Sequence, residues 1–292
     1  MKRAYFNMHL AIFLWGFTGI LGKAIEMSEG MIVWYRMAIS AIGLLPLLLS
    51  RKIIIPSKTD ILGISYVGML VALHWVLFYG AIKASNVSIA LSCFSSISLF
   101  TALLEPLSRN QKPKMAEILL GISVMVGLYV IFSVQKLYYT GILLAIGSAL
   151  LGAIFTIQNK KLTAKHPPEV ITFYELVSGF LIFSALLPIY FTVTSTSFEL
   201  PTVMDFFYLL LLGWVCTSYA FTISLKALKK LDAFTLNLSV NLEPLYSILL
   251  AMVLFKEYNM LNAGFIAGTL IILGSVVVHS WYKWHIQKPL NE

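Results

Sequence analysis

Ten long apolar segments limit what this chain can fold into. They cover residues 5–25, 31–49, 61–82, 87–107, 115–134, 141–157, 170–193, 206–225, 233–255 and 260–284. Most have the length at which a helix, rising about 1.5 Å per residue, crosses a hydrocarbon core of about 30 Å. Only 12% of the residues are charged, which is too few for the water-facing surface of a soluble domain. The sequence therefore predicts an all-α integral membrane protein with ten transmembrane helices.

The loops between these segments alternate in positive charge. The N-terminus, the even-numbered loops and the tail hold most of the 21 Lys and Arg residues, whereas the odd-numbered loops hold only Lys23, Lys83, Lys136 and Lys256. Loops rich in Lys and Arg stay on the cytoplasmic side. The pattern therefore predicts that both termini are cytoplasmic in a bacterial-type inner (plasma) membrane. Because the charges form no single basic patch, we expect the lipid bilayer, and no nucleic acid, as a partner.

An internal repeat relates the two halves of the chain. Residues 81–83 (Ala-Ile-Lys) resemble residues 227–229 (Ala-Leu-Lys), 146 positions later. Each half contains five apolar segments, an odd number, so the second half must enter the membrane from the opposite side. We therefore expect two inverted five-helix repeats, at 1–134 and 140–284, followed by a cytoplasmic tail at 285–292. Carriers built from inverted repeats bind their substrates near the midplane, where the repeats meet.

An acidic residue lies near the middle of the ninth segment. Glu243 is followed by Pro244 and preceded by Asn241. A charged side chain at this depth costs about 2.5 kcal/mol or more, and such residues commonly face a polar interior. Glu243 and Asn241 are therefore candidates for contact with a substrate or a coupling ion. The alternative is a protonated glutamate that bonds to a neighbouring helix.

A basic residue lies inside the second segment. The planar guanidinium of Arg36 is suited to a substrate carboxylate or phosphate, although Arg36 can also serve structurally by snorkelling or by pairing with an acid. In the repeat Arg36 matches Glu175, and we expect these two to act as opposing gates of a pathway. Arg36 and Glu243 together would suit a zwitterion such as an amino acid, unless they pair with each other.

His74 lies well inside the third segment. An ordinary histidine pKa near 6.5 suits proton coupling, and the structural alternative is a hydrogen-bonded histidine in an apolar helix. Tyr79, Trp15, Trp34 and Trp75 are candidates for lining a cavity, where they would stack on an aromatic or cationic ligand. Aromatic residues of membrane proteins also serve in core packing and interfacial belts.

Several of these features resemble the EamA family of the drug/metabolite transporter (DMT) superfamily. They are the Ala-x-Lys motif before the fourth and ninth segments, Leu-Glu-Pro-Leu at 242–245, and Leu-Phe-Lys-Glu at 254–257, which is similar to the Leu-Gly-Glu that often ends this helix. The first half departs from the family pattern, because Ser98 stands where a proline is usual and Glu105 and Pro106 follow two turns later. The resemblance covers nearly the whole chain. It implies a carrier of small organic metabolites, often an exporter of amino acids or related compounds.

No enzyme signature accompanies these features. The sequence contains no HExxH, P-loop or GxSxG motif and no His/Cys cluster. We therefore expect no catalytic residue, metal or cofactor, and predict a secondary transporter of a small-molecule substrate that works by alternating access. The alternative is a membrane enzyme or assembly factor acting on lipid-linked substrates. A GxxxG motif at Gly264 and Gly268 would allow close packing on the ninth segment or in a homodimer.

Overall fold

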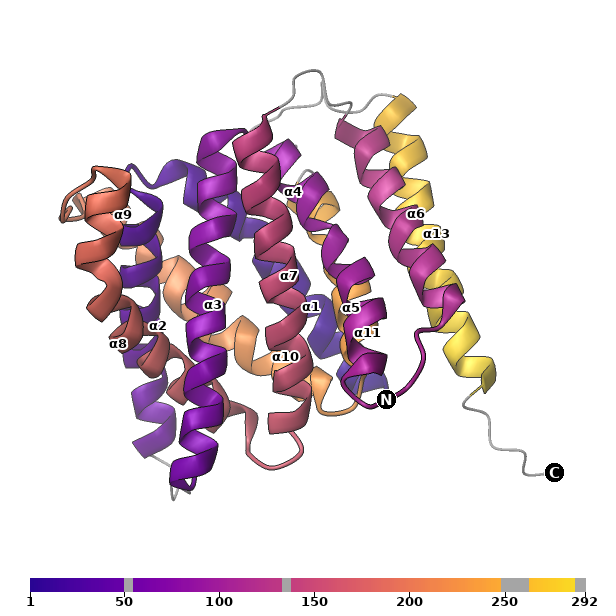
Figure 1. Cartoon of the computed structure of the whole chain (residues 1–292), viewed down its shortest axis with the longest axis horizontal. Helices are drawn as coiled ribbons and strands as arrows, with labels where there is room; N and C mark the ends of the chain where they lie inside the picture. The colour runs from indigo at the N-terminus through magenta and orange to yellow at the C-terminus, as the bar shows by residue number, and fades with distance from the viewer. Residues whose placement is uncertain (50–54, 133–137, 248–262, 287–292) are drawn as a thin grey trace.

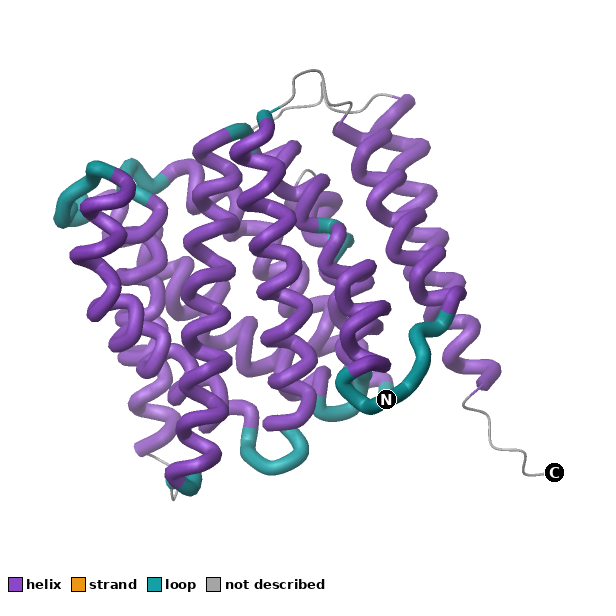
Figure 2. Tube along the Cα trace, in the orientation of Figure 1, coloured by secondary structure: helices purple, strands orange, loops and turns teal. Residues whose placement is uncertain are grey.

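The computed structural model describes residues 1–49, 55–132, 138–247 and 263–286, and every regular element in these ranges is helical (Figures 1 and 2). The chain continues as a helix at 243–247. The helices are α1 (Lys2–Ala24), α2 (Glu29–Leu49), α3 (Lys58–Ala84), α4 (Val87–Phe94), α5 (Ser96–Leu107), α6 (Met115–Phe132), α7 (Tyr139–Leu162), α8 (Pro168–Thr194), α9 (Val203–Leu210), the π-helix η1 (Leu211–Tyr219), α10 (Ala220–Leu228), α11 (Ala233–Val240) and α13 (Ala263–Ile286).

Short polar side chains start several of these helices. The side chains of Ser57, Asn86 and Asp232 each accept a hydrogen bond from the backbone amide three residues further on, at 3.2, 2.9 and 2.7 Å, and thereby begin α3, α4 and α11. Such caps satisfy N–H groups that the first helical turn leaves without a partner. The turn signals between the apolar segments therefore fix where these helices begin.

Eight helical stretches in the described ranges are long and apolar enough to cross a membrane, and Met115–Ile131 is a shorter apolar helix. The chain is therefore a multi-pass membrane protein. Most predicted segments match a helix to within a few residues, although α7 extends five residues beyond the predicted end at 157. Residues 248–262, which hold the end of the ninth predicted segment, and residues 287–292 of the predicted tail lie outside the described residues.

Two predicted segments are not continuous helices. The fourth divides into α4 and α5 at Ser95, and the ninth breaks after α11 at Asn241 and Leu242. At the first break the Ser95 hydroxyl donates to the Ser92 carbonyl at 2.6 Å, a bond that competes with the helical ladder. At the second, Pro244 lacks the N–H that would extend the ladder. The breaks at Ser95 and Asn241 lie 146 positions apart, which is the offset of the sequence repeat.

Small residues set the distances between the packed helices. Ala145, Ala149 and Ala153 form a fully buried stripe on α7, and Figure 1 shows α7 beside α3 in the middle of the bundle. At one flank α6 packs on α13 (Figure 1), where a β-carbon on Gly268 would lie 2.3 Å from the Gly127 carbonyl oxygen. Gly268 therefore contacts α6, a helix that the sequence analysis did not name beside its two alternatives, the ninth segment and a homodimer.

The segment between α9 and α10 is wound as a π-helix. In η1 the Thr217 hydroxyl donates to the Leu212 carbonyl at 2.7 Å, and the Ser218 hydroxyl donates to the Gly213 carbonyl at 3.0 Å, each five residues earlier. Ser40 of α2 also donates to the Gly213 carbonyl, at 2.8 Å. Turns of this type are rare and are frequent at functional sites. Here the π-helix directs hydroxyl groups toward α2.

Candidate functional site

One cavity lies among α1, α2, α3, α4, α5, α7, α10 and α11. The space between its lining residues measures about 740 Å³, a figure that includes the part open to solvent. The aromatic residues of its wall are Trp15, Trp75, Phe78, Phe94, Phe155 and Phe221. The polar ones are Thr18, Arg36, His74, Thr156, Asn159, Ser224, Asn237 and Glu243. A largely apolar wall with a few polar groups is typical of a site for a small organic molecule.

Arg36 lies in the wall of this cavity and is held from three sides. Its Nε donates to Thr217 Oγ1 at 2.7 Å, and its Nη1 donates to the Tyr79 hydroxyl at 3.0 Å. The guanidinium carbon lies 3.9 Å from the centroid of a Trp75 ring, which is a cation–π contact. Tyr79 is buried and does not itself line the cavity. Its role in this geometry is to orient Arg36.

Glu243 lies in the same wall and contacts the other half of the chain. Thr18 of α1 donates to Glu243 Oε1 at 3.4 Å, and the carboxylate is only 7% exposed. No ion pair joins Arg36 to Glu243 in the part of the chain that the structure describes. The cavity therefore presents a cation and a carboxyl group that are not joined in an ion pair.

His74 joins α3 to α7 at the edge of the cavity. Its Nδ1 lies 2.8 Å from the Ser148 carbonyl oxygen and 2.9 Å from the Ser148 hydroxyl. Because a carbonyl only accepts, Nδ1 carries the proton, and Nε2 of the neutral ring is an acceptor. The ring also packs on Phe94 and Phe155. His74 thus has the hydrogen bonds of a structural histidine and also lines the cavity.

Asn241 does not line the cavity. Its Nδ2 donates to the backbone carbonyls of Asn237 and Leu238, both at 3.2 Å, at the end of α11. The residue that lines the cavity is Asn237, one turn earlier. Its Nδ2 donates to Thr101 of α5 at 2.8 Å, and its Oδ1 accepts from Thr156 of α7 at 3.3 Å. Asn241 therefore closes a helix end, and Asn237 ties three helices together.

Glu175 lies outside the cavity wall. It is fully buried on α8, beside the side chain of Asn159. Trp34 is also elsewhere, because its Nε1 donates to Ser184 at 2.8 Å and its ring packs on Phe180. Of the predicted residues, the structure brings Arg36, His74 and Glu243 into one cavity, together with Trp15 and Trp75.

The sequence analysis did not select five polar residues of the wall. Thr18, Thr156, Asn159, Ser224 and Asn237 are each at most 5% exposed. Thr156 and Asn159 lie three positions apart, as neighbours on one face of α7. The spacing of Thr156 and Asn159 was the signal in the sequence that could have identified them as wall residues. Polar residues at helical spacing also occur, however, on helix faces that pack against other parts of a protein.

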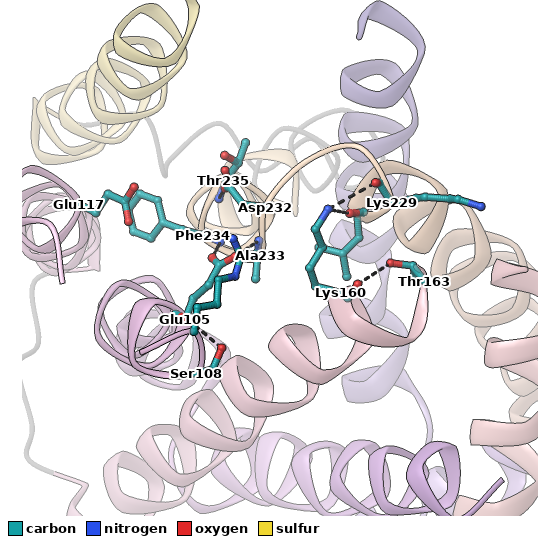
Figure 3. Close-up of polar contacts among 12 residues, drawn as sticks. Glu105, Ser108, Glu117, Lys160, Thr163, Lys229, Asp232, Ala233, Phe234 and Thr235 are labelled. Carbon is teal, nitrogen blue, oxygen red and sulfur yellow. Dashed lines mark hydrogen bonds and ion pairs between the residues drawn. The ribbon is translucent and has the colours of Figure 1, made fainter. Parts of the chain in front are cut away.

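A network of polar groups closes one end of the bundle beside the cavity. Glu105 of α5 accepts hydrogen bonds from the amides of Phe234 at 2.8 Å and Ala233 at 3.3 Å, in the first turn of α11. Lys160 of α7 donates to the Leu228 carbonyl at 2.8 Å, in the last turn of α10. Figure 3 shows both side chains reaching toward the segment that joins α10 and α11. They bind opposite helix ends with the charge that each end favours.

Two comparisons with known proteins match nearly the whole chain. The model of the EamA-like transporter family matches residues 2–133 and 139–281. A crystal structure that is described only as that of a protein superimposes with a TM-score of 0.78. The alignment covers 96% of this chain and 98% of that chain at 17% sequence identity, which shows a shared fold. No curated protein matches the sequence.

The family model thus matches twice, once in each half of the chain, and its members are membrane transporters of the DMT superfamily. The two breaks at matched positions and the cavity among helices of both halves agree with this assignment. The protein belongs to the EamA-like transporter family.

Proposed function

We propose that this protein is a secondary transporter that exports a small zwitterionic metabolite, such as an amino acid or a related compound. The observation that carries the proposal is the charge arrangement of the cavity. Arg36 and Glu243 both line it, and each is held by neutral partners rather than by the other. A molecule with a carboxylate and an ammonium group would satisfy both, and its apolar part would pack on the aromatic wall.

The proposed mechanism is alternating access between two inverted halves of five helices each, ten in all. The helix breaks at Ser95 and Asn241 support it, because broken helices near the midplane are typical of binding sites in such carriers. The cavity is lined from both halves, by Trp15 and His74 of the first and by Phe221 and Glu243 of the second. Rocking of one half against the other would expose this site to each side in turn.

The distribution of Lys and Arg supports an orientation with both termini in the cytoplasm of a bacterial-type inner membrane. In that orientation the network of Glu105 and Lys160 faces the cytoplasm. We assign to Arg36 the binding of the substrate carboxylate and to Glu243 the binding of its ammonium group. Tyr79 positions Arg36, and His74 offers an acceptor at the edge of the cavity.

Thermal-shift screening of the purified protein against amino acids, amines, nucleotides and sugars tests the proposal. A solute that binds only the folded protein raises its stability by about 2.7 kcal/mol at one hundred times its dissociation constant. We expect the amino acids or related zwitterions to stabilise the protein, and sugars and nucleotides to have no effect.

Flux measurements then separate a transporter from an enzyme. Liposomes that contain only this protein should carry the stabilising solute across the bilayer unchanged. A chemically altered product without net flux would contradict transport and favour the membrane-enzyme alternative. Stabilisation by sugars alone would contradict the assignment of the substrate class.

A further inference from the structure

Glu175 and Asn159 are two buried polar side chains whose only polar neighbour among the described residues is each other. Both are 0% exposed. Neither carboxylate oxygen of Glu175 and neither side-chain polar atom of Asn159 makes a hydrogen bond within the described residues. The two side chains nevertheless lie next to each other, across α8 and α7. Buried polar groups are nearly always paired, so an unpaired couple of this kind calls for an explanation.

No charged group compensates Glu175. Among the described residues, none of the charged side chains on the helices around it acts on its carboxyl group. Five of them are bonded elsewhere. Arg36 of α2 bonds to Thr217 and Tyr79, Asp60 of α3 to Lys165 and His166, and His74 of α3 to Ser148. Lys160 of α7 bonds to the Leu228 carbonyl, and Lys226 of α10 to Glu169 of α8. Of the tyrosines on α2 and α3, Tyr35 bonds to the Glu199 carbonyl, Tyr79 bonds to Arg36, and Tyr66 is exposed.

Protonation is the energetically most favourable way to remove the charge of such a carboxylate. An ionised carboxylate without a partner in an apolar interior is strongly unfavourable, and the group takes up a proton instead. A divalent metal cation would need a shell of about six oxygen ligands. No cluster of three or more metal-binding side chains occurs in the described part of the chain. One carboxyl group beside one amide therefore suits a proton better than a metal ion.

A column of polar groups leads from Glu175 to the end of the bundle. Glu169, Thr172 and Glu175 are spaced by three residues on one face of α8, as are neighbours on a helix surface. Thr222 of α10 lies opposite, with its hydroxyl 3.5 Å from that of Thr172. At the outer end Lys226 pairs with Glu169 at 2.7 Å. The Lys226 side chain is 42% exposed, so the column reaches solvent.

Asn159 connects the same site to the central cavity. It lies in the cavity wall and is one turn from Thr156, which donates to Asn237 at 3.3 Å. A change of charge on Glu175 would therefore act on the side chain of a residue that forms part of the cavity wall.

We propose that Glu175 is a proton-binding site, separate from Arg36 and Glu243, whose state is sensed in the cavity through Asn159. The consequence that solute flux is coupled to protons rests on the proposed function. The pair of Glu169 and Lys226 marks the solvent-exposed end of α8, six residues before Glu175.

Labelling with dicyclohexylcarbodiimide tests this site, because the reagent modifies protonated carboxyl groups in apolar surroundings. The full-length protein in detergent or nanodiscs is treated over a pH series, and the labelled peptides are quantified by mass spectrometry. We expect labelling of Glu175, with a labelled fraction that falls about tenfold per pH unit above its midpoint, as one proton site requires. Exchange of sodium chloride for choline chloride should leave the labelling unchanged.

Two variants sharpen the result. Glu175→Gln should lose this label and keep any label on Glu243, which serves as an internal control. Asn159→Leu, of similar shape, should extend labelling of Glu175 to higher pH, because the carboxylate loses the polar group beside it. Size-exclusion profiles check that both variants are folded, and the wild-type titration itself does not depend on them.

Three outcomes would overturn the proposal: no label on Glu175, a labelled fraction that does not change with pH, or protection by sodium. An unchanged profile in folded Asn159→Leu would overturn the link to the cavity. These results are independent of solute flux. A protein that labels as expected but carries no solute contradicts the proposed function alone, and a carrier whose Glu175 does not titrate contradicts the proton site alone.

Discussion

Arg36 Nε donates a 2.7 Å hydrogen bond to Thr217 Oγ1 and thereby joins α2 to the π-helix η1. The same hydroxyl donates to the Leu212 carbonyl, five residues earlier in the chain. The wide π turn therefore determines where Thr217 meets the guanidinium. The position of the cavity's cation depends on backbone geometry in the other half of the protein.

Removal of the Thr217 hydroxyl should weaken solute binding. In Thr217→Val the guanidinium loses one of its two hydrogen-bond partners, at a cost of about 0.5–1.5 kcal/mol. We expect the dissociation constant of the stabilising solute to rise about 2–10-fold in thermal-shift titrations. Thr163→Val is the matched control, because this hydroxyl is also buried but bonds to the Lys160 carbonyl. Equal effects of the two substitutions would contradict a positioning role for Thr217.

Substitution of Glu243 by glutamine should reduce transport and alter its pH dependence. Glu243→Gln keeps the shape and the contact with Thr18, but it cannot carry a charge or exchange a proton. Loss of a charged hydrogen bond of about 1.5–3 kcal/mol corresponds to about a tenfold or greater loss of affinity. The measurement is flux of the stabilising solute into liposomes over a pH series. Glu117→Gln is the control, since this buried acid of α6 pairs with Lys114 outside the cavity.

A wild-type rate and pH profile in Glu243→Gln would assign a structural role to this residue. Its function would then be the hydrogen bond that joins the helix after α11 to Thr18 of α1.

Neutralisation of Glu105 should destabilise the protein more than neutralisation of its ion-pair partner. Glu105 is 6% exposed and caps two amides of α11, so Glu105→Gln should lower the free energy of unfolding by about 1–3 kcal/mol. The Arg109 side chain is 47% exposed, and it pairs with Glu105 from the turn that follows α5. An exposed pair of this kind contributes about 0.2–1 kcal/mol. In thermal unfolding in detergent, Glu105→Gln should therefore have a clearly lower melting temperature than Arg109→Gln. The reverse order of melting temperatures would contradict the capping role of Glu105.

Two glycines of α3 should respond in opposite directions to a methyl group. A β-carbon on Gly68 would lie 2.4 Å from the Glu175 carbonyl oxygen, a backbone atom that cannot move aside cheaply. A β-carbon on Gly63 would meet no atom within 4 Å. We expect Gly68→Ala to lower the melting temperature and to separate α3 from α8. Gly63→Ala should match the wild type or exceed it by up to about 1 kcal/mol, since alanine favours the helix. Equal melting temperatures would show that the two helices do not approach so closely.

The sequence was sufficient for a multi-pass, all-helical membrane protein and for the charged residues of the cavity. The length of an apolar segment predicts a membrane span regardless of the segments around it. A charged or titratable side chain inside a span must face a polar interior or a partner, so Arg36, His74 and Glu243 stood out as candidates. The helix break at Ser95 was not predicted, because hydroxyl groups that bond back to the backbone leave no mark on hydropathy. The break at Asn241 follows from Pro244. The sequence analysis noted this proline but did not predict that it would interrupt the helix.

The partners of the polar residues could not be predicted. Asn237 bonds to α5 and α7, more than 80 residues away along the chain, and only the packing of helices brings these groups together. Tyr79 and Glu175 were grouped with the substrate contacts for their residue types. In the structure Tyr79 lies behind Arg36, and Glu175 lies behind Asn159. The direction in which a side chain points depends on how its helix is rotated about its axis, and the residue type alone does not determine that rotation.

The π-helix also bears on the reach of its membrane span. A π turn takes up more residues than the 3.6 of an α turn, so η1 rises less per residue than an α-helix does. The span formed by α9, η1 and α10 has 26 residues, against 27 in α3, which occupies the matching place in the repeat. The two spans are therefore nearly equal in residues but unequal in the distance that they cross.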